Sequence, residues 1–238
     1  MAEDKWLLCA ESKDILNHQW YLICRRRETL IHYSACCSDY IFMKILICIR
    51  SRPGMRLEDV RKACLNCTKC DLCKTRTNVV FGTGRDDADI MFVGEGPGQE
   101  EDLQGKPFVG RSGQLLSSYL GAVGINRDEV FITNIVKCRP PGNRDPKPEE
   151  QELCIDYLKS QVRVIKPAVI VCLGRIAACR LIDEDFKVTK QHGEIIHKKG
   201  YTMIGTYHPS ALLRNPTLKF AALKDFQIIA AEAKNNRD

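Results

Sequence analysis

The sequence predicts an α/β protein, a three-layer α/β/α sandwich around a mostly parallel, four-stranded central sheet. Short apolar runs alternate with segments whose apolar residues recur at helical spacing. Strands that are apolar without interruption are buried on both faces, as in parallel sheets covered by helices. The chain has 238 residues, of which 44% are hydrophobic and 28% charged, and this is sufficient to fill such a core.

Each expected element follows from a local pattern. Four apolar runs, closed by glycine or by polar residues, predict strands at 89–94, 130–136, 168–174 and 202–207. Apolar residues at helical spacing predict helices at 57–63, 112–123, 148–165, 175–182 and 218–234. Gly124 supplies a stop for the second helix. Pro148 and the two glutamates after it supply a favourable first turn for the third.

Residues 1–54 differ from the rest of the chain. They carry five of the 13 cysteines, both tryptophans and a run of three arginines at 25–27, with no sustained helical or strand period. A turn signal at 51–54 predicts a boundary between an N-terminal extension, 1–54, and a folded domain, 55–238. The extension is either an accessory segment that touches DNA through its arginines or a weakly ordered one, even one outside a natural start at Met55. We favour the weakly ordered segment.

The composition excludes several classes of protein. No apolar run approaches the ~18–20 residues that a membrane span needs, and the acidic first four residues do not resemble a secretory signal. An odd total of 13 cysteines argues against a disulfide framework. We expect a cytoplasmic protein, a monomer, with no membrane partner. The net charge of +6 permits a polyanionic partner without requiring one.

Three of the four strands lead into segments rich in functional residue types. These segments are 94–98 after the first strand, 134–141 at the second and 208–210 after the fourth. Since ligands bind at the carboxyl ends of parallel strands, we expect the three segments to line one site. The glycines of 94–98 let the backbone approach a ligand closely. The acidic residues there are either part of the site or a solvated charge run: Glu95, Glu100, Glu101 and Asp102.

Six cysteines are candidate metal ligands. Three successive Cys-x-x-Cys pairs are formed by Cys64, Cys67, Cys70 and Cys73, and two further thiols follow at Cys138 and Cys154. Thiolates at this spacing reach a common ion, which indicates zinc or a four-iron cluster. Six candidates exceed the four positions of either centre, so two are spare. Residues three apart also share a helix face, so one pair could instead belong to the core.

Two polar residues stand at strand ends. Asn134 either anchors its loop or presents its amide to the donor and acceptor edge of a ligand. His208 is either a structural residue or a ring donor, with Ser210 and Arg214 near enough in sequence to contact phosphate. Leu212 or the leucine after it is a candidate wedge between bases.

Four ordered blocks of this sequence resemble the family 4, thermostable-type uracil-DNA glycosylases. The blocks are Gly-Glu-Gly-Pro-Gly-x-Glu-Glu-Asp at 94–102, Gly-Lys-Pro-Phe-Val-Gly-Arg-Ser-Gly at 105–113, Ile-Thr-Asn-Ile-Val-Lys-Cys-Arg-Pro-Pro at 132–141 and His-Pro-Ser-x-Leu-Leu-Arg-Asn-Pro at 208–216. The resemblance runs from about Leu57 to the C-terminus and leaves residues 1–54 uncovered. It implies the glycosylase fold for the domain at 55–238.

The resemblance also implies an activity. Such enzymes flip uracil out of DNA and hydrolyse its N-glycosidic bond, which leaves an abasic site for base excision repair. Uracil-containing DNA would be the partner. The family holds a structural four-iron four-sulfur cluster (4Fe-4S), whose matching ligands here are Cys67, Cys70, Cys138 and Cys154. Cys64 and Cys73 depart from the family's minimal pattern, so either is an alternative ligand.

The resemblance and the chemistry of this reaction together suggest roles for the residues around the base. Phe108 looks like the ring that stacks on the flipped base, and Asn134 like the amide that pairs with uracil N3–H and O4. His208 would donate to O2 as the uracil anion departs. Backbone N–H groups around Gly96 would add to that stabilisation.

A carboxylate should favour the oxocarbenium-like sugar or orient water. Glu95 and Glu101 are both candidates, because Gly96 occupies the position of the broader superfamily's catalytic aspartate. The expected phosphate contacts are Ser112, Ser210 and Arg214.

Two alternatives stay open. A glycosylase of the same fold could take another deaminated base, hypoxanthine or xanthine, and cleavage of an inosine-containing duplex would reveal it. A non-catalytic iron–sulfur or zinc protein could bind DNA without excising a base. His208→Ala and Asn134→Ala discriminate here, because they would change DNA affinity only if the predicted pocket exists.

Overall fold

The computed structural model describes residues 20–23, 30–33 and 55–235. The chain divides into two units, Met1–Gly54 and Met55–Asp238. In the first unit, β1 (Trp20–Ile23) and β2 (Leu30–Tyr33) form a two-stranded antiparallel sheet. The arginine run at 25–27 and the turn signal at 51–54 lie outside the described residues. The role of 1–54 therefore stays a prediction.

The second unit is built on a six-stranded mixed sheet with the order β3-β5-β4-β6-β8-β7. Its four central strands are parallel and are the four that the apolar runs predict: β5 (Phe131–Asn134), β4 (Ile90–Gly94), β6 (Val169–Leu173) and β8 (Tyr201–Thr206). Two antiparallel edge strands, β3 (Thr83–Gly84) and β7 (Ile195–Lys198), correct the predicted number of four. The first is only two residues long and the second is partly solvated, so neither produces an apolar run.

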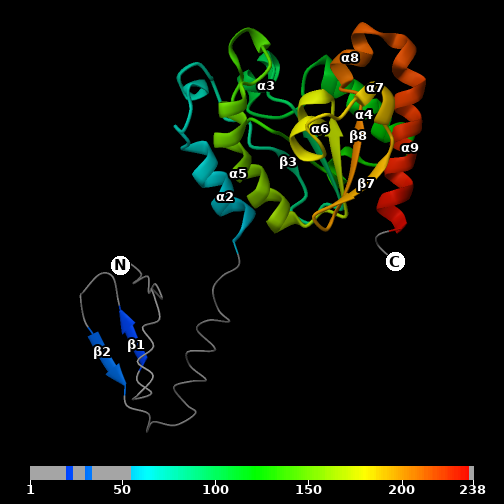
Figure 1. Ribbon diagram of the computed structural model, residues 1–238. Helices are drawn as coiled ribbons and strands as arrows, with labels where there is room; N and C mark the ends of the chain where they lie inside the picture. Colours follow the sequence, from blue (N-terminus) through cyan, green and yellow to red (C-terminus); the bar gives the residue numbers. More distant parts are fainter. Residues whose placement is uncertain (1–19, 24–29, 34–54, 236–238) are drawn as a thin grey trace. The chain divides into compact units, whose positions relative to one another are not determined.

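Helices cover both faces of this sheet, which confirms the three-layer fold (Figure 1). One face packs against α2 (Leu57–Leu65), α5 (Pro148–Ile165) and α6 (Arg175–Leu181). The other packs against α4 (Arg111–Ala122) and α9 (Lys219–Asn235). Side chains of a strand alternate between the two faces, so β4 sends Met91 and Val93 into the first core and Ile90 and Phe92 into the second.

Short elements lie in the connections between the strands and the longer helices. The helices among them are α3 (Gln99–Gln104) after β4, α7 (Val188–Gln191) before β7, and α8 (Pro209–Arg214) after β8. The 3-10 turns are η1 (Asp71–Lys74), η2 (Arg127–Glu129), η3 (Pro141–Asn143) and η4 (Pro216–Leu218). The sequence did not predict them, because they are too short for a helical period to be recognised. No helix in the described part of the chain combines the length and the apolar character needed to cross a membrane.

Candidate active site

A cleft of about 660 Å³ opens at the carboxyl edge of the sheet. Segments that follow β4, β5, β6 and β8 contribute to its walls, as expected where parallel strands end together. All of the predicted catalytic and substrate-binding residues except Leu212 line it: Glu95, Gly96, Glu101, Phe108, Ser112, Asn134, His208, Ser210 and Arg214. The fold thus brings residues that are far apart in the chain into one site.

Phe108 forms one wall of the cleft from an unusual backbone conformation. Its φ of 52° lies in the left-handed region, which a bulky residue adopts only when its surroundings enforce it. The Arg127 guanidinium donates to the Phe108 carbonyl oxygen at 2.8 Å, and Glu101 Oε1 accepts the backbone N–H groups of the next two residues, each at 2.9 Å. At Gly113, a Cβ would come 1.7 Å from the same carbonyl oxygen. These contacts fix the backbone turn that carries the Phe108 ring.

Asn134 is the last residue of β5 and lies in the cleft with one atom unpaired. It is 1% exposed, and its Oδ1 is the one buried side-chain N or O atom among the described residues without a hydrogen-bond partner. Gly94, on the neighbouring strand, makes room for it, because a Cβ there would lie 2.4 Å from this oxygen. A buried polar atom without a partner costs about 1–3 kcal/mol. Because Asn134 lines the cleft, this unpaired acceptor points to a ligand that supplies a donor.

His208 lies beside Phe108, with the two ring centroids 5.6 Å apart. Its Nδ1 accepts the backbone N–H of Ser210 at 3.1 Å and so caps α8. Because a backbone N–H can only donate, the proton of the neutral ring sits on Nε2. Burial, and then the charge of Arg214, lowers the pKa of His208 to about 4, against an opposing effect of Glu101. The ring is therefore neutral at pH 7 and offers Nε2–H as a donor.

The two candidate carboxylates have different surroundings. Glu101 Oε1 already accepts hydrogen bonds from the backbone N–H groups of Val109 and Gly110 in the Phe108 turn. Glu95 follows β4 directly and is partly buried in the cleft wall. Burial, and then the nearby carboxylate of Asp145, raises the pKa of Glu95 to about 7, and Arg175 opposes this rise. Glu95 therefore changes its charge near neutral pH, as a general acid or base does.

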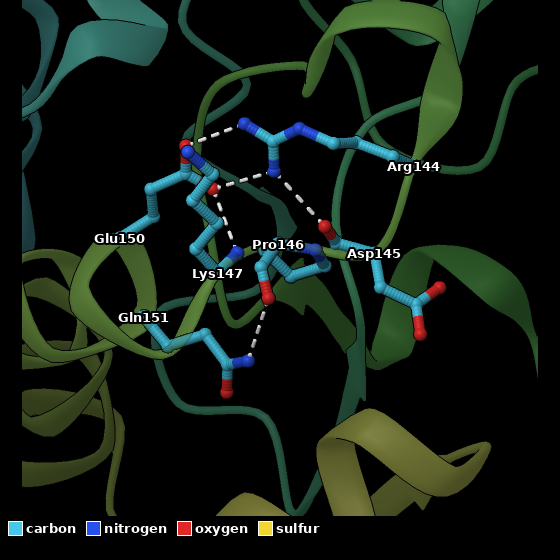
Figure 2. Close-up of polar contacts among 6 residues, drawn as sticks. All are labelled: Arg144, Asp145, Pro146, Lys147, Glu150 and Gln151. Carbon is cyan, nitrogen blue, oxygen red and sulfur yellow. Dashed lines mark hydrogen bonds and ion pairs between the residues drawn. The ribbon is translucent and has the colours of Figure 1, made fainter.

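Arg144 and Asp145, which line the cleft, lie in a loop that is fastened to the start of α5 (Figure 2). Arg144 donates to the two carboxylate oxygens of Glu150 at 2.9 and 2.7 Å, and to the backbone carbonyl of Asp145 at 3.0 Å. The Asp145 carboxylate points away from this network and pairs with Arg175 at 2.7 Å. The loop and the first residue of α6 thus place a carboxylate, Asp145, and a guanidinium group, Arg175, where they shift the pKa of Glu95 in opposite directions.

The six candidate cysteines line a second, smaller pocket, formed by α2, η1, the turn after β5 and α5: Cys64, Cys67, Cys70, Cys73, Cys138 and Cys154. Arg76 donates to Cys138 Sγ at 3.1 Å, and the backbone N–H of Lys137 donates to Cys154 Sγ at 3.4 Å. Burial raises the pKa of Cys64 to about 12 and that of Cys138 to about 11. These thiols therefore need a metal or a cation to become thiolates.

The donors that line this pocket are of the kind that a cysteine-ligated iron–sulfur cluster uses: six thiols, with a guanidinium group on Cys138 and a backbone N–H on Cys154. Among the described residues, no group of three or more Cys, His, Asp or Glu side chains is arranged to hold a single metal ion.

Comparisons with known proteins decide the family. The family profile described as "Uracil DNA glycosylase superfamily" matches residues 81–230. This chain belongs to that superfamily. The Type-4 uracil-DNA glycosylase of Archaeoglobus fulgidus is 47% identical over 181 residues, which cover 73% of this chain and 91% of the relative. The Type-4 enzyme of Thermotoga maritima is 47% identical over 175 residues, which cover 72% and 91%. The resemblance drawn from the four sequence blocks is confirmed.

Within the glycosylase domain, Leu212 is the predicted site residue that the fold puts elsewhere. It is 1% exposed and packs in the core between the sheet, α4 and α9. A side chain buried in this way does not reach DNA, so the expectation that Leu212 wedges between bases is corrected. The next residue, Leu213, is partly exposed and remains a candidate.

The glycosylase cleft also contains residues that sequence reasoning missed: Asn143, Arg144, Asp145, Arg175 and Tyr207. Arg175 had a detectable signal, because it follows a glycine at the end of the β6 strand just as Glu95 follows one at the end of β4. Asn143 is the last residue of η3, Arg144 and Asp145 lie in the loop after it, and Tyr207 directly follows β8. Tertiary contacts, rather than a local pattern, place them in the cleft.

Proposed function

We propose that this protein is a uracil-DNA glycosylase, which hydrolyses the N-glycosidic bond of deoxyuridine in DNA and leaves an abasic site. Its superfamily and the names of its relatives support this function. The single observation in the site that carries it is the buried, unpaired Asn134 Oδ1 in the cleft. A base stacked in a duplex cannot reach a buried atom, so the target base must be flipped out of the helix.

Asn134 selects the base through its amide. Uracil presents N3–H next to O4, so Oδ1 accepts from N3–H while Nδ2 donates to O4. Cytosine presents an acceptor at N3 and a donor at its C4 amino group. The acceptor Oδ1 would then face an acceptor, and the donor Nδ2 would face a donor. Each such contact discriminates by about 1–3 kcal/mol.

Phe108 and His208 act on the base from different directions. The Phe108 ring stacks on the uracil face. When the C1′–N1 bond breaks, its electron pair leaves with N1 and the charge spreads to O2. The Nε2–H of neutral His208 donates to O2 and so stabilises the uracil anion, with backbone N–H groups around Gly96 adding to the effect.

Glu95 is the carboxylate that we assign to the reacting sugar. In its ionised form it favours the positive charge that develops at C1′ and accepts a proton from the water that adds there. Glu101 is assigned as the positioning residue of the Phe108 turn, since its Oε1 already accepts two backbone N–H groups. The phosphates flanking the flipped nucleotide are assigned to Ser112, Ser210 and Arg214.

We further propose that four of the six clustered thiols hold a 4Fe-4S cluster. The assigned ligands are Cys67, Cys70, Cys138 and Cys154, with Cys64 and Cys73 as alternatives. When bound, the cluster supplies a cross-link between the α2 and η1 segment, the turn after β5, and α5. The monomeric state and the cytoplasmic location remain predictions.

The test is base excision by protein purified without oxygen. Oligonucleotides containing uracil, thymine, cytosine or hypoxanthine are incubated with the protein and cleaved with alkali, which breaks the strand at abasic sites. Hypoxanthine is included because it also presents an N–H next to a carbonyl. Scission at uracil, lost in His208→Asn, supports the proposal. Faster scission at hypoxanthine than at uracil would make hypoxanthine the preferred substrate base. No scission at any base would contradict the proposed activity and favour the alternative of a non-catalytic DNA-binding protein.

A further inference from the structure

Lys137 is a buried cation between the cysteine pocket and the cleft. It is 1% exposed, and its Nζ donates to Thr133 Oγ1 at 2.6 Å, to the Asn134 carbonyl oxygen at 2.7 Å and to Gln161 Oε1 at 2.8 Å. An ammonium group has three protons to donate, so all of them are used. The side chain is therefore fixed at its charged end.

These three acceptors are a hydroxyl, a backbone carbonyl and an amide, so none of them carries a negative charge. A buried charge is costly unless an opposite charge lies near it. Lys137 lines the cysteine pocket, and its backbone N–H donates to Cys154 Sγ. Thiolates bound to an iron–sulfur cluster would supply the missing negative charge, and Arg76, on Cys138, would be the second cation beside them.

The same ammonium group also binds the backbone of Asn134, the residue assigned to base recognition. The peptide group that joins Asn134 to Ile135 is held at both ends, because Lys137 Nζ binds its carbonyl oxygen and its N–H donates to the Gly94 carbonyl oxygen at 2.9 Å. The orientation of this peptide sets the direction of the Asn134 side chain. A shift of the ammonium group toward or away from the thiols would therefore move the amide in the cleft.

We propose that Lys137 is a positioning residue that makes the geometry of Asn134 depend on the iron–sulfur cluster. The proposal rests on the proposed function and on the proposed cluster. Its ammonium group balances the negative charge of the thiolates on one side and fixes the Asn134 peptide on the other. The cluster then acts on base recognition without taking part in electron transfer.

The test is Lys137→Met, which keeps the length of the side chain and removes its charge. We expect kcat/KM on uracil to fall about tenfold or more while iron is retained. The reduction potential of the cluster should fall, because a positive charge beside it is lost. In the Asn134→Leu background the same change should have little further effect on excision, since Lys137 acts through Asn134. Lys159→Met, an exposed lysine on α5, is the matched control and should change none of these values.

A second variant covers the case in which Lys137→Met does not fold. Gln161→Glu keeps the side-chain size and puts a carboxylate on the ammonium group, so that it competes with the thiolates for the cation. We expect a lower potential and faster loss of iron to a chelator. Excision and potential equal to wild type in the folded variants would overturn the proposal, as would a wild-type protein without iron. A wild type that holds iron but does not excise uracil would refute the proposed function instead, and the potentials would still decide whether Lys137 is coupled to the cluster.

Discussion

Asn134→Leu is expected to stabilise the protein and to remove most of its activity. Asn134 is 1% exposed, and its buried Oδ1 has no hydrogen-bond partner. Replacing it with an apolar group of similar shape should recover about 1–3 kcal/mol, or a rise in Tm of roughly 2–12 °C for a chain of this length. The two contacts to uracil contribute about 1–3 kcal/mol each, so kcat/KM should fall by at least roughly thirtyfold.

For the stability measurement, the matched control is Gln161→Leu, which removes an equally buried amide whose groups are paired. Gln161 Nε2 donates to the Phe81 carbonyl oxygen at 2.8 Å, and Oε1 accepts from Lys137. This variant should lose about 1–3 kcal/mol, because its partners are left unpaired. Thermal unfolding followed by circular dichroism and single-turnover excision of uracil are measured on both variants and the wild type. An Asn134→Leu protein that is less stable than wild type and excises uracil at the wild-type rate would show that this amide serves the fold.

Four further predictions follow from the site. With Glu95 acting as an ionised base, kcat/KM should rise with pH around a midpoint near 7, and Asp145→Asn should move that midpoint to lower pH, because a carboxylate that raises the pKa is lost. The pKa of His208 is lowered from 6.5 to about 4 in the folded protein, so the unfolded chain takes up a proton first as the pH falls. The free energy of unfolding should therefore decrease by up to about 3 kcal/mol between pH 6.5 and 4. Denaturant unfolding measures this decrease, which should be absent in His208→Gln. Cys138→Ser should lose iron and the absorbance band near about 400 nm of an iron–sulfur centre. A chain that starts at Met55 should keep both iron and uracil excision, and loss of excision with the iron intact would show that residues 1–54 take part.

Much of the fold could be predicted from short-range pattern. The four central strands and α5, which spans Pro148–Ile165 as expected, are continuous or regularly spaced apolar segments, and their burial follows from their composition. The edge strand β7 escaped prediction because its exposed and half-buried residues alternate at a sheet margin. The helix α8 escaped prediction because its six residues are too few to show a helical period. Without this helix, nothing in the sequence indicated that Leu212 faces the core, and the prediction that it faces DNA was wrong.

The sequence by itself determined which chemical groups are available and that strand ends bring them to one edge. Glycine-flanked acids, an asparagine and a histidine at strand ends, and six spaced thiols can all be recognised without coordinates. Only the tertiary structure decided what each group does there. Glu101 is occupied by backbone N–H groups while burial and Asp145 raise the pKa of Glu95, yet the two glutamates look alike in sequence.

Tertiary contacts also distinguish Asn134 and Lys137 from the other polar residues of their strand and turn. Asn134 has an unpaired oxygen that lies against Gly94, and Lys137 has a fully paired ammonium group, one of whose acceptors is Gln161. Gly94 and Gln161 lie far from these two residues in the chain. Burial, hydrogen-bond partners and local charge are properties of neighbours in space. A sequence names the residues that carry the chemistry, and packing then fixes their protonation and their partners.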